Sequence, residues 1–246
     1  MKRYIKKTDD DILIEIKIFR ELRPTYGYKR ITAMINRNRV TEGLKKLNRK
    51  RIYRIMDMND LLQKKYPSRR KHEGTGKVMT LHSNTRWCSD AFELQCFNGE
   101  KVYVAFSLDC RDREAIGFVA RERNLVAQDI RTLMFDSVIK RFGDAKTPHK
   151  IQWLTDRGTI YRASSTRQAA NDLGLLTCYT APYSPSSNGM AEALVHTIKR
   201  DYAYLADLKD AETVLKLLPK WFDDYNKIAP HSALNMMSPV EFKKTN

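Results

Sequence analysis

The strongest constraint on the fold is a succession of short strand-like runs between residues 86 and 181. Three runs rich in aromatic and β-branched residues come first, joined by turn signals such as Asn98-Gly99. Such runs favour an antiparallel meander. The expected strands are 86–97, 101–110, 115–120, 150–156 and 175–181, with helices at 125–143 and 166–174. This order predicts an α/β fold with a mixed five-stranded sheet flanked by helices.

A different pattern precedes these strands. Three amphipathic helices are expected at 9–22, 28–37 and 48–62, with Asn48 capping the third. Their apolar spacing places these side chains inward: Ile12, Ile16, Phe19, Leu22, Ile31, Met34, Ile35, Ile52, Ile55 and Met56. The outer face of the third helix carries Arg49, Lys50, Arg51 and Arg54. Many small helical bundles share this pattern, but the basic last helix favours a helix-turn-helix-like module that could enter a major groove of DNA.

The excess positive charge lies at the N-terminus. The chain carries a net charge of +16, and residues 1–86 hold 24 Lys or Arg against 9 Asp or Glu. This asymmetry favours a nucleic-acid partner over a merely soluble basic surface. Residues 64–77 are basic, polar and interrupted by Pro and Gly, which is typical of a linker. We therefore expect a DNA-binding domain at 1–63, a linker at 64–80 and a second domain at 81–246.

Composition argues against several other classes of protein. No apolar run approaches the ~18 residues of a membrane span, and the basic N-terminus lacks the apolar segment of a signal peptide. The four cysteines, Cys88, Cys96, Cys110 and Cys178, form no C-x-x-C pair. This spacing favours reduced thiols over disulfides or a zinc site. We expect a cytoplasmic protein with no membrane partner.

Three acidic residues occupy positions that predict a metal site. Asp90 lies inside the first strand, Asp156 ends the fourth, and Glu192 lies early in a helix. If these strands are adjacent, the two aspartates stand side by side, and such carboxylates share a proton or hold cations. Hard oxygen ligands favour Mg²⁺ or Mn²⁺. Each acid alone is more often a turn or helix-dipole residue, so the prediction depends on all three together.

The C-terminal part of the chain is expected to be helical, with breaks at 182–189, Pro219 and Pro230. The helix that carries Glu192 has a predicted buried side of Ala191, Leu194, Val195, Ile198 and Tyr202. Its outer side carries Lys199, which we expect to meet a DNA phosphate, and the preceding Ser-Ser-Asn-Gly turn should cap it. Asp109 and Asp112 belong to a charged hairpin that we expect to be solvated, and they are not assigned to the site.

These segments carry a resemblance to a known family. WCSDAFE, WLTDRGTIYRA and SPSSNGMAEALVHTIKRDY resemble the three acidic motifs of D,D(35)E transposases and retroviral integrases, with 35 residues between Asp156 and Glu192. WFDDYNKIAPHSALNMMSPVEF resembles the end of that catalytic domain in bacterial insertion-sequence transposases. RPTYGYKRITAMINR and NRKRIYRIM resemble the helix-turn-helix region that precedes it. The resemblance covers residues 20–243 and points to the OrfB type of transposase.

The resemblance implies a ribonuclease H-like core that cleaves DNA at insertion-element ends and transfers the 3′-OH to a target. It implies that Asp90, Asp156 and Glu192 are catalytic and bind two Mg²⁺ or Mn²⁺ ions, and that Lys199 approaches the DNA end. The implied partners are double-stranded DNA, further copies of the chain on DNA and an OrfA-type product, in a bacterial cytoplasm at the nucleoid. Ala229 and Ala193-Leu194 depart from the usual family residues, but neither removes a ligand.

Two other interpretations stay open. One is a metal-dependent nuclease of the same fold that cuts DNA without joining it. The other is a non-catalytic DNA-binding regulator derived from a transposase. Joined DNA products would argue against the first, and a cellular function that survives substitution of the three acids would favour the second.

Overall fold

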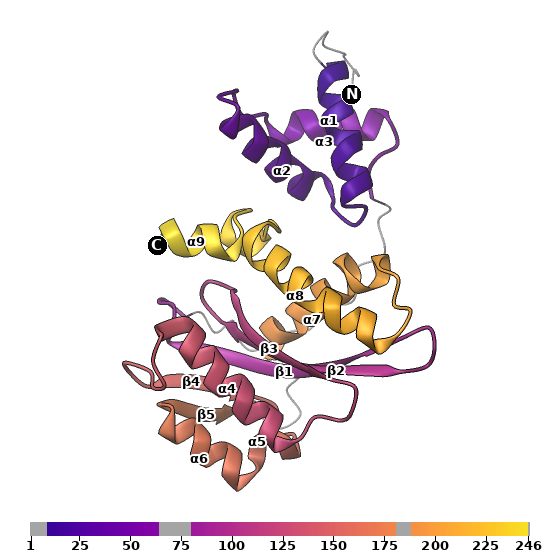
Figure 1. Cartoon of the computed structure of the whole chain (residues 1–246). Coiled ribbons are helices and arrows are strands. Elements are labelled where there is room, and N and C mark those ends of the chain that lie inside the picture. Colours follow the sequence, from indigo (N-terminus) through magenta and orange to yellow (C-terminus); the bar gives the residue numbers. More distant parts are fainter. Residues whose placement is uncertain (1–8, 64–79, 181–187, 246) are drawn as a thin grey trace. The chain divides into compact units, whose positions relative to one another are not determined.

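The computed structural model describes residues 9–63, 80–180 and 188–245 (Figure 1). It divides into two compact units. The first comprises Met1–His72 with Ala229–Ser238, and the second comprises Glu73–Ile228 with Pro239–Asn246. Most of the predicted linker at 64–80 lies outside the described residues, so the predicted domain boundaries stay predictions.

Three helices form the described core of the first unit: α1 (Asp9–Leu22), α2 (Tyr28–Thr41) and α3 (Arg49–Met58). The Asn48 side chain accepts a hydrogen bond from the Lys50 amide at 2.9 Å, which confirms the predicted cap of the third helix. Nine of the ten predicted inward side chains are buried. Leu22 is the exception at 66% exposed, because α1 ends at this residue and the chain turns away toward α2.

The second unit is built on a mixed sheet in the order β3-β2-β1-β4-β5. Its strands are β1 (Arg86–Gln95), β2 (Lys101–Asp109), β3 (Ala115–Arg121), β4 (Ile151–Thr155) and β5 (Leu175–Tyr179). The first three pair antiparallel, whereas β4 runs parallel to both β1 and β5. The predicted mixed five-stranded sheet is therefore confirmed.

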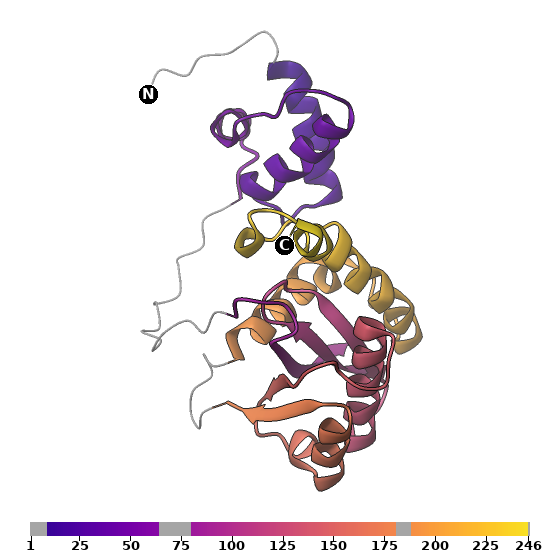
Figure 2. The same cartoon turned by 90° about the vertical axis from the view of Figure 1, so that its left-hand side faces the viewer.

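Helices cover both faces of this sheet (Figures 1 and 2). One face packs on α4 (Ala127–Phe142), α5 (Thr159–Arg162) and α6 (Ser164–Asp172), and the other on α7 (Gly189–Asp201) and α8 (Ala211–Lys227). The short helices η2 (Ala203–Leu205), η3 (Ser232–Leu234) and α9 (Pro239–Thr245) follow in the C-terminal part. No helix of the described residues is both long and apolar enough to cross a membrane.

Alternation along β1 decides which side chain meets which layer. Trp87 belongs to the core under α4, whereas Cys88, Phe92 and Leu94 belong to the core under α7 and α8. Asp90 has the same parity as Cys88 and Phe92. It therefore faces the layer that contains α7.

Helix α8 continues through Pro219, so the predicted break there is wrong. Proline removes one backbone donor and ordinarily breaks a helix. Here the helix buries Leu218, Trp221 and Phe222, and the Phe222 ring stacks on Phe118 with centroids 4.4 Å apart. Tertiary packing on both sides of the proline offsets the lost hydrogen bond.

The charged hairpin after β2 is buried, which contradicts the predicted solvation of Asp109 and Asp112. Both are fully buried. Arg141 of α4, whose side chain is 2% exposed, pairs with Asp109, Asp112 and Glu114. Burial raises the pKa of Asp109, and the Asp112 charge adds to this, while backbone amides and Arg141 oppose it. These acids form a structural network around a buried arginine.

Candidate active site

Two of the three predicted acids come together through the pairing of β1 with β4. The last paired residues of these parallel strands are Cys88 and Leu154. Two residues further along each strand, the same register places Asp90 level with Asp156. The condition that the two strands are adjacent is met, and Asp156 follows the last residue of β4, where an open α/β sheet commonly binds ligands.

Asp90 is held partly buried on the α7 side of the sheet. Its Oδ1 accepts a hydrogen bond from the Ala91 amide at 2.8 Å. Burial, together with the charges of Asp156 and Glu192, raises the pKa of Asp90 to about 6 against the opposing Ala91 bond. Asp156 and Glu192 therefore lie close enough to Asp90 to influence it electrostatically.

Asp156 is exposed where the chain leaves the sheet. Its Oδ1 accepts a hydrogen bond from the Gly158 amide at 2.9 Å. A Cβ atom at residue 158 would lie 3.0 Å from that oxygen, which is tighter than ordinary packing allows. Glycine at this position therefore leaves room for the Asp156 carboxylate.

Glu192 projects from the first turns of α7 and is exposed. The opposite side of the helix is anchored in the core by Ala191, Leu194 and Ile198, each at most 1% exposed. Tyr202 is also buried as predicted, whereas Val195 is only partly buried. This anchoring holds the helix on the sheet while its acid faces outward.

The start of α7 differs from the prediction. Asn188 occupies the N-cap position, but its side chain makes no capping hydrogen bond. Its Nδ2 instead donates to the Ser89 carbonyl oxygen at 3.4 Å, next to Asp90. The rest of the predicted turn, 182–187, lies outside the described residues. The sequence indicated a polar side chain at the start of this helix, but Asn188 bonds to Ser89 rather than capping the helix.

The donor set fits a hard divalent cation in its chemistry, although the carboxylates are not gathered around one point. No described Lys, Arg or His forms an ion pair with any of the three acids. Within residues 9–63, 80–180 and 188–245, no three His, Cys, Asp or Glu side chains lie close enough to hold one ion. Coordination by all three acids therefore requires their side chains to approach one another.

Two buried hydroxyls below the acids escaped the sequence analysis. Ser89 Oγ and the Tyr161 hydroxyl lie 3.2 Å apart and are hydrogen-bonded. Burial raises the pKa of Tyr161 above its ordinary value, which keeps the hydroxyl neutral. The pair joins β1 to α5, which begins shortly after Asp156. Only the position of Tyr161 within TDRGTIYRA could have suggested this role.

Lys199 lines a groove of about 590 Å³. The groove is bounded by Ala91, Phe92, Tyr103, Asn124 and Ile160, among others. Lys199 Nζ lies 5.8 Å from the centroid of the Phe92 ring. A cationic amine therefore sits at the wall of an open groove that includes Ala91, the residue after Asp90.

The four basic residues predicted on α3 divide into two pairs. Arg49 and Lys50 are exposed. Arg51 and Arg54 instead bind the buried Asp9 carboxylate of α1, at 2.7 and 2.6 Å. These two arginines fasten α3 to α1, so a phosphate would have to compete with Asp9 for them. Their predicted contact with DNA stays a prediction.

Family models match most of the chain. An integrase core domain matches residues 81–185, and a second integrase core model matches residues 173–239. An HTH-like domain matches residues 7–71. The fold and the matched models define a transposase with an integrase core and an HTH-like domain.

Curated relatives give the particular family. Transposase InsD of insertion element IS2A/D/F/H/I/K from Escherichia coli is 44% identical over 246 residues, covering 98% of this chain and 81% of the relative. InsD of IS2-9 from strain K12 is equally similar and is covered to 79%. The chain belongs to the IS2 InsD family of insertion-element transposases.

Solved structures agree on the fold. A chain of the simian T-cell lymphotropic virus intasome, solved in complex with PP2A regulatory subunit B56 gamma, superposes with a TM-score of 0.56. The match has 15% identity and covers 93% of this chain and 73% of that one. The HTLV-2 integrase catalytic core domain, solved with magnesium, gives a TM-score of 0.51 at 13% identity, covering 66% and 97%. The ribonuclease H-like core is therefore shown.

Proposed function

We propose that this transposase cleaves DNA at the ends of its insertion element and joins the freed 3′-OH to a target, with Asp90, Asp156 and Glu192 as its catalytic acids. The observation that carries the proposal is the strand register that places Asp90 level with Asp156, on a strand that packs against the helix bearing Glu192. Burial and the charges of Asp156 and Glu192 raise the pKa of Asp90 to about 6, and a divalent cation would stabilise such a set of acids with no described basic partner.

Each residue of the proposed site has a defined task. Asp90 and Asp156 supply oxygen ligands from adjacent strands, and Glu192 supplies a third from α7. Two Mg²⁺ or Mn²⁺ ions, when bound, would activate the attacking oxygen and stabilise the leaving oxygen of an in-line displacement. Lys199 would hold a phosphate of the DNA end in the adjoining groove. The buried Ser89–Tyr161 pair would keep the strand and the following helix in place.

The partners follow from charge and family. Double-stranded DNA would bind the basic N-terminal region, where Arg49 and Lys50 are exposed. The intasome suggests an assembly of several copies on DNA, and the resemblance to OrfB-type transposases implies an OrfA-type product as a further partner. We place this activity at the bacterial nucleoid. The boundaries 1–63, 64–80 and 81–246 remain part of the proposal.

The test uses full-length protein and a labelled duplex that carries one element end beside flanking DNA. With Mn²⁺ present, the wild-type protein should yield both nicked ends and joined products. Nicked ends without any joined product would instead identify a nuclease of the same fold. A regulator without catalytic function would bind the duplex and yield neither product.

DNA binding by the first unit is tested by replacing Arg49 and Lys50 together with Ala. If each residue contacts one phosphate, the slope of log affinity against log salt should fall by about 1 for each. An unchanged slope would show that α3 is not the DNA-binding element.

A further inference from the structure

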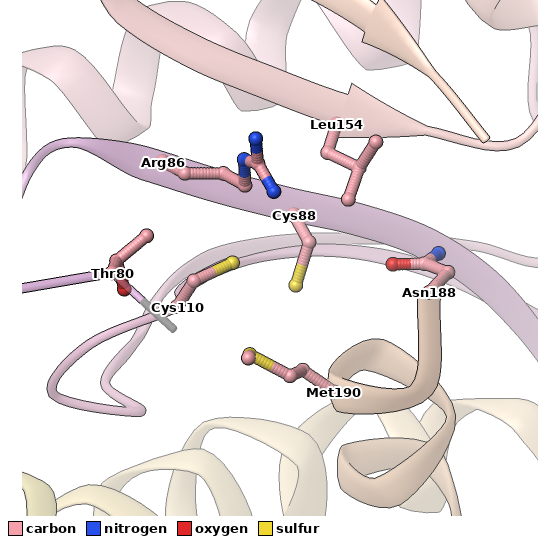
Figure 3. A pocket seen from close by; sticks show the side chains of 7 residues that line it. All are labelled: Thr80, Arg86, Cys88, Cys110, Leu154, Asn188 and Met190. Carbon is pink, nitrogen blue, oxygen red and sulfur yellow. The ribbon is translucent and has the colours of Figure 1, made fainter. Parts of the chain in front are cut away.

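A small cavity lies behind the acids, between β1, the residue after β2 and the first turn of α7 (Figure 3). Its volume is about 30 Å³. Three sulfur-bearing side chains line it, those of Cys88, Cys110 and Met190, together with Asn188 and Thr80. Cys88 lies two residues before Asp90, and Met190 lies two residues before Glu192. The cavity therefore adjoins β1 and α7, which carry Asp90 and Glu192.

Asn188 is the buried polar side chain at this cavity. It is 7% exposed, and Figure 3 shows its amide oxygen directed toward the enclosed space. The amide nitrogen is used by the Ser89 carbonyl, but Oδ1 has no hydrogen-bond partner among the described residues. The Thr80 hydroxyl is also buried and without a described partner. Two unmatched polar atoms at one cavity call for a ligand that can both donate and accept.

The volume of the cavity limits which ligand can occupy it. One water molecule needs room for about one probe sphere and two to four polar partners. The space of about 30 Å³ meets the first condition. The Asn188 oxygen and the two weakly polar thiols of Cys88 and Cys110 meet the second, whereas Figure 3 shows Thr80 at the opposite end of the cavity from Asn188. A single ordered water therefore fits both the volume and the chemistry.

The position of Asn188 in the sequence connects the cavity to the proposed catalytic acids. Asn188 lies four residues, about one helical turn, before Glu192, and its partner Ser89 immediately precedes Asp90. The apolar contacts of Leu194 and Ile198 press α7 on the sheet but are not directional. A hydrogen bond depends on both distance and angle. The Asn188 amide is thus the described contact that can fix the start of α7 against β1.

We propose that Asn188 is a positioning residue, which sets Glu192 relative to Asp90 through its bond to Ser89 and through one water molecule held in this cavity against its amide oxygen. Its link to catalysis rests on the proposed function. The positioning itself is a statement about α7 and β1 and can be measured without metal or DNA.

The experiment compares full-length wild-type protein with Asn188→Ala. Because this side chain makes no capping bond, the substitution removes the Ser89 contact and the water ligand without removing a helix cap. Amide hydrogen exchange of residues 190–192 in metal-free protein should accelerate by about fivefold, the effect of losing one net hydrogen bond. Exchange in α4 should not change. The Mg²⁺ concentration for half-maximal cleavage should rise severalfold, whereas affinity for DNA should not.

Met190→Leu is the matched control, because it lines the same cavity and retains both polar groups. It should leave exchange and the Mg²⁺ requirement as in the wild type. Thr80→Val, at the far end of the cavity, keeps both Asn188 contacts and should likewise leave exchange as in the wild type. If Asn188→Ala lowers the thermal midpoint of the whole protein, unchanged exchange in α4 still separates a local release of α7 from global unfolding.

Unchanged exchange of residues 190–192 in Asn188→Ala would overturn the proposal, and so would an equal acceleration in Met190→Leu. The outcome is separable from the proposed function. If Glu192→Gln still cleaved DNA, the catalytic assignment would fail, but the exchange measurement would still decide whether Asn188 holds α7 on β1.

Discussion

The two groups of acids on this sheet differ in how their charge is balanced. Asp109, Asp112 and Glu114 surround the buried guanidinium of Arg141. Asp109 also accepts hydrogen bonds from the backbone amides of Asn84 and Arg111, each at 2.7 Å. Asp90, Asp156 and Glu192 have no described cationic partner, and the hydrogen bonds recorded for Asp90 and Asp156 come from nearby amides of their own segments.

This difference separates acids that stabilise the fold from acids that can bind a cation. The charge of a buried carboxylate paired with an arginine is already neutralised, and the pair holds two elements together. Burial and a neighbouring acid raise the pKa of Asp109 as well, but Arg141 and two backbone amides offset its charge. Asp90 has only the Ala91 amide and lies near two further acids, so a cation from solution can neutralise the remaining charge.

The largest expected effect is on catalysis. Asp156→Asn should lower cleavage and joining by about 10³-fold or more, because one charged oxygen ligand is lost from the proposed metal site. Affinity for duplex DNA should change little. Asp223→Asn, on an exposed acid of α8 that pairs with Lys227, is the control and should retain activity. Joining by Asp156→Asn at a tenth of the wild-type rate would contradict the assignment.

For the acids around Arg141, we expect the main effect of a substitution on the stability of the fold rather than on catalysis. Arg141→Met leaves three acids without their shared counter-charge, and removing one partner of a buried ion pair costs about 3–5 kcal/mol. Denaturant unfolding measures this loss. Lys216→Ala removes an exposed ion pair with Glu212 and should leave stability almost unchanged. Equal stabilities for the two variants would show that the buried network contributes little.

The pH dependence of stability tests the unbalanced charge of Asp90. The pKa of Asp90 is raised from 3.8 to about 6 in the folded protein, so the fold binds this proton more tightly than the unfolded chain does. Its ionisation destabilises the fold progressively as pH rises from about 4 to 6, and the full cost remains above that range.

Asp90→Asn removes this cost and should raise the free energy of unfolding at pH 7 by about 2 kcal/mol. The gain over wild type should shrink as the pH is lowered toward 5. Urea unfolding at pH 5, 6 and 7 measures it. A variant that is less stable than wild type at pH 7 would show that Asp90 is stabilised by a partner, as Asp109 is.

The smallest expected effect concerns Lys199. Because the amine lies at the wall of an open groove, Lys199→Ala should weaken binding of the element end by about fivefold at moderate salt, close to 1 kcal/mol. The fold should keep its thermal midpoint. Binding measured at rising salt concentration should show the difference fading. A loss that is independent of salt would mean that Lys199 acts through packing on Phe92 rather than through its charge.

Much of the fold could be predicted because local pattern and tertiary packing agree. The alternating strands, the helix spacing and the cap at Asn48 all appear in the structure. Pro219 was misjudged because the local rule for proline ignores the buried aromatic side chains that flank it. Leu22 was misjudged because helical spacing does not reveal where the covering helices end.

The candidate site was predictable in part for the same reason. The order of strands placed Asp90 beside Asp156, and register then made them level. The burial of Asp109 and Asp112 could not be foreseen, because their counter-ion Arg141 comes from a helix about thirty residues away in the sequence. Asn188 could be recognised as a turn residue, but only the folded chain brings Ser89 within its reach.

The central claim is that Asp90, Asp156 and Glu192 together bind a divalent cation. Thermal unfolding with and without Mn²⁺ at constant ionic strength is its most direct test. For the wild-type protein at pH 7, Mn²⁺ at several times its dissociation constant should raise the midpoint by about 2–4 °C. In Asp90→Asn, Asp156→Asn and Glu192→Gln most of this shift should disappear. A wild-type midpoint that does not change with Mn²⁺, or a shift in all three variants equal to that of the wild type, would contradict the account.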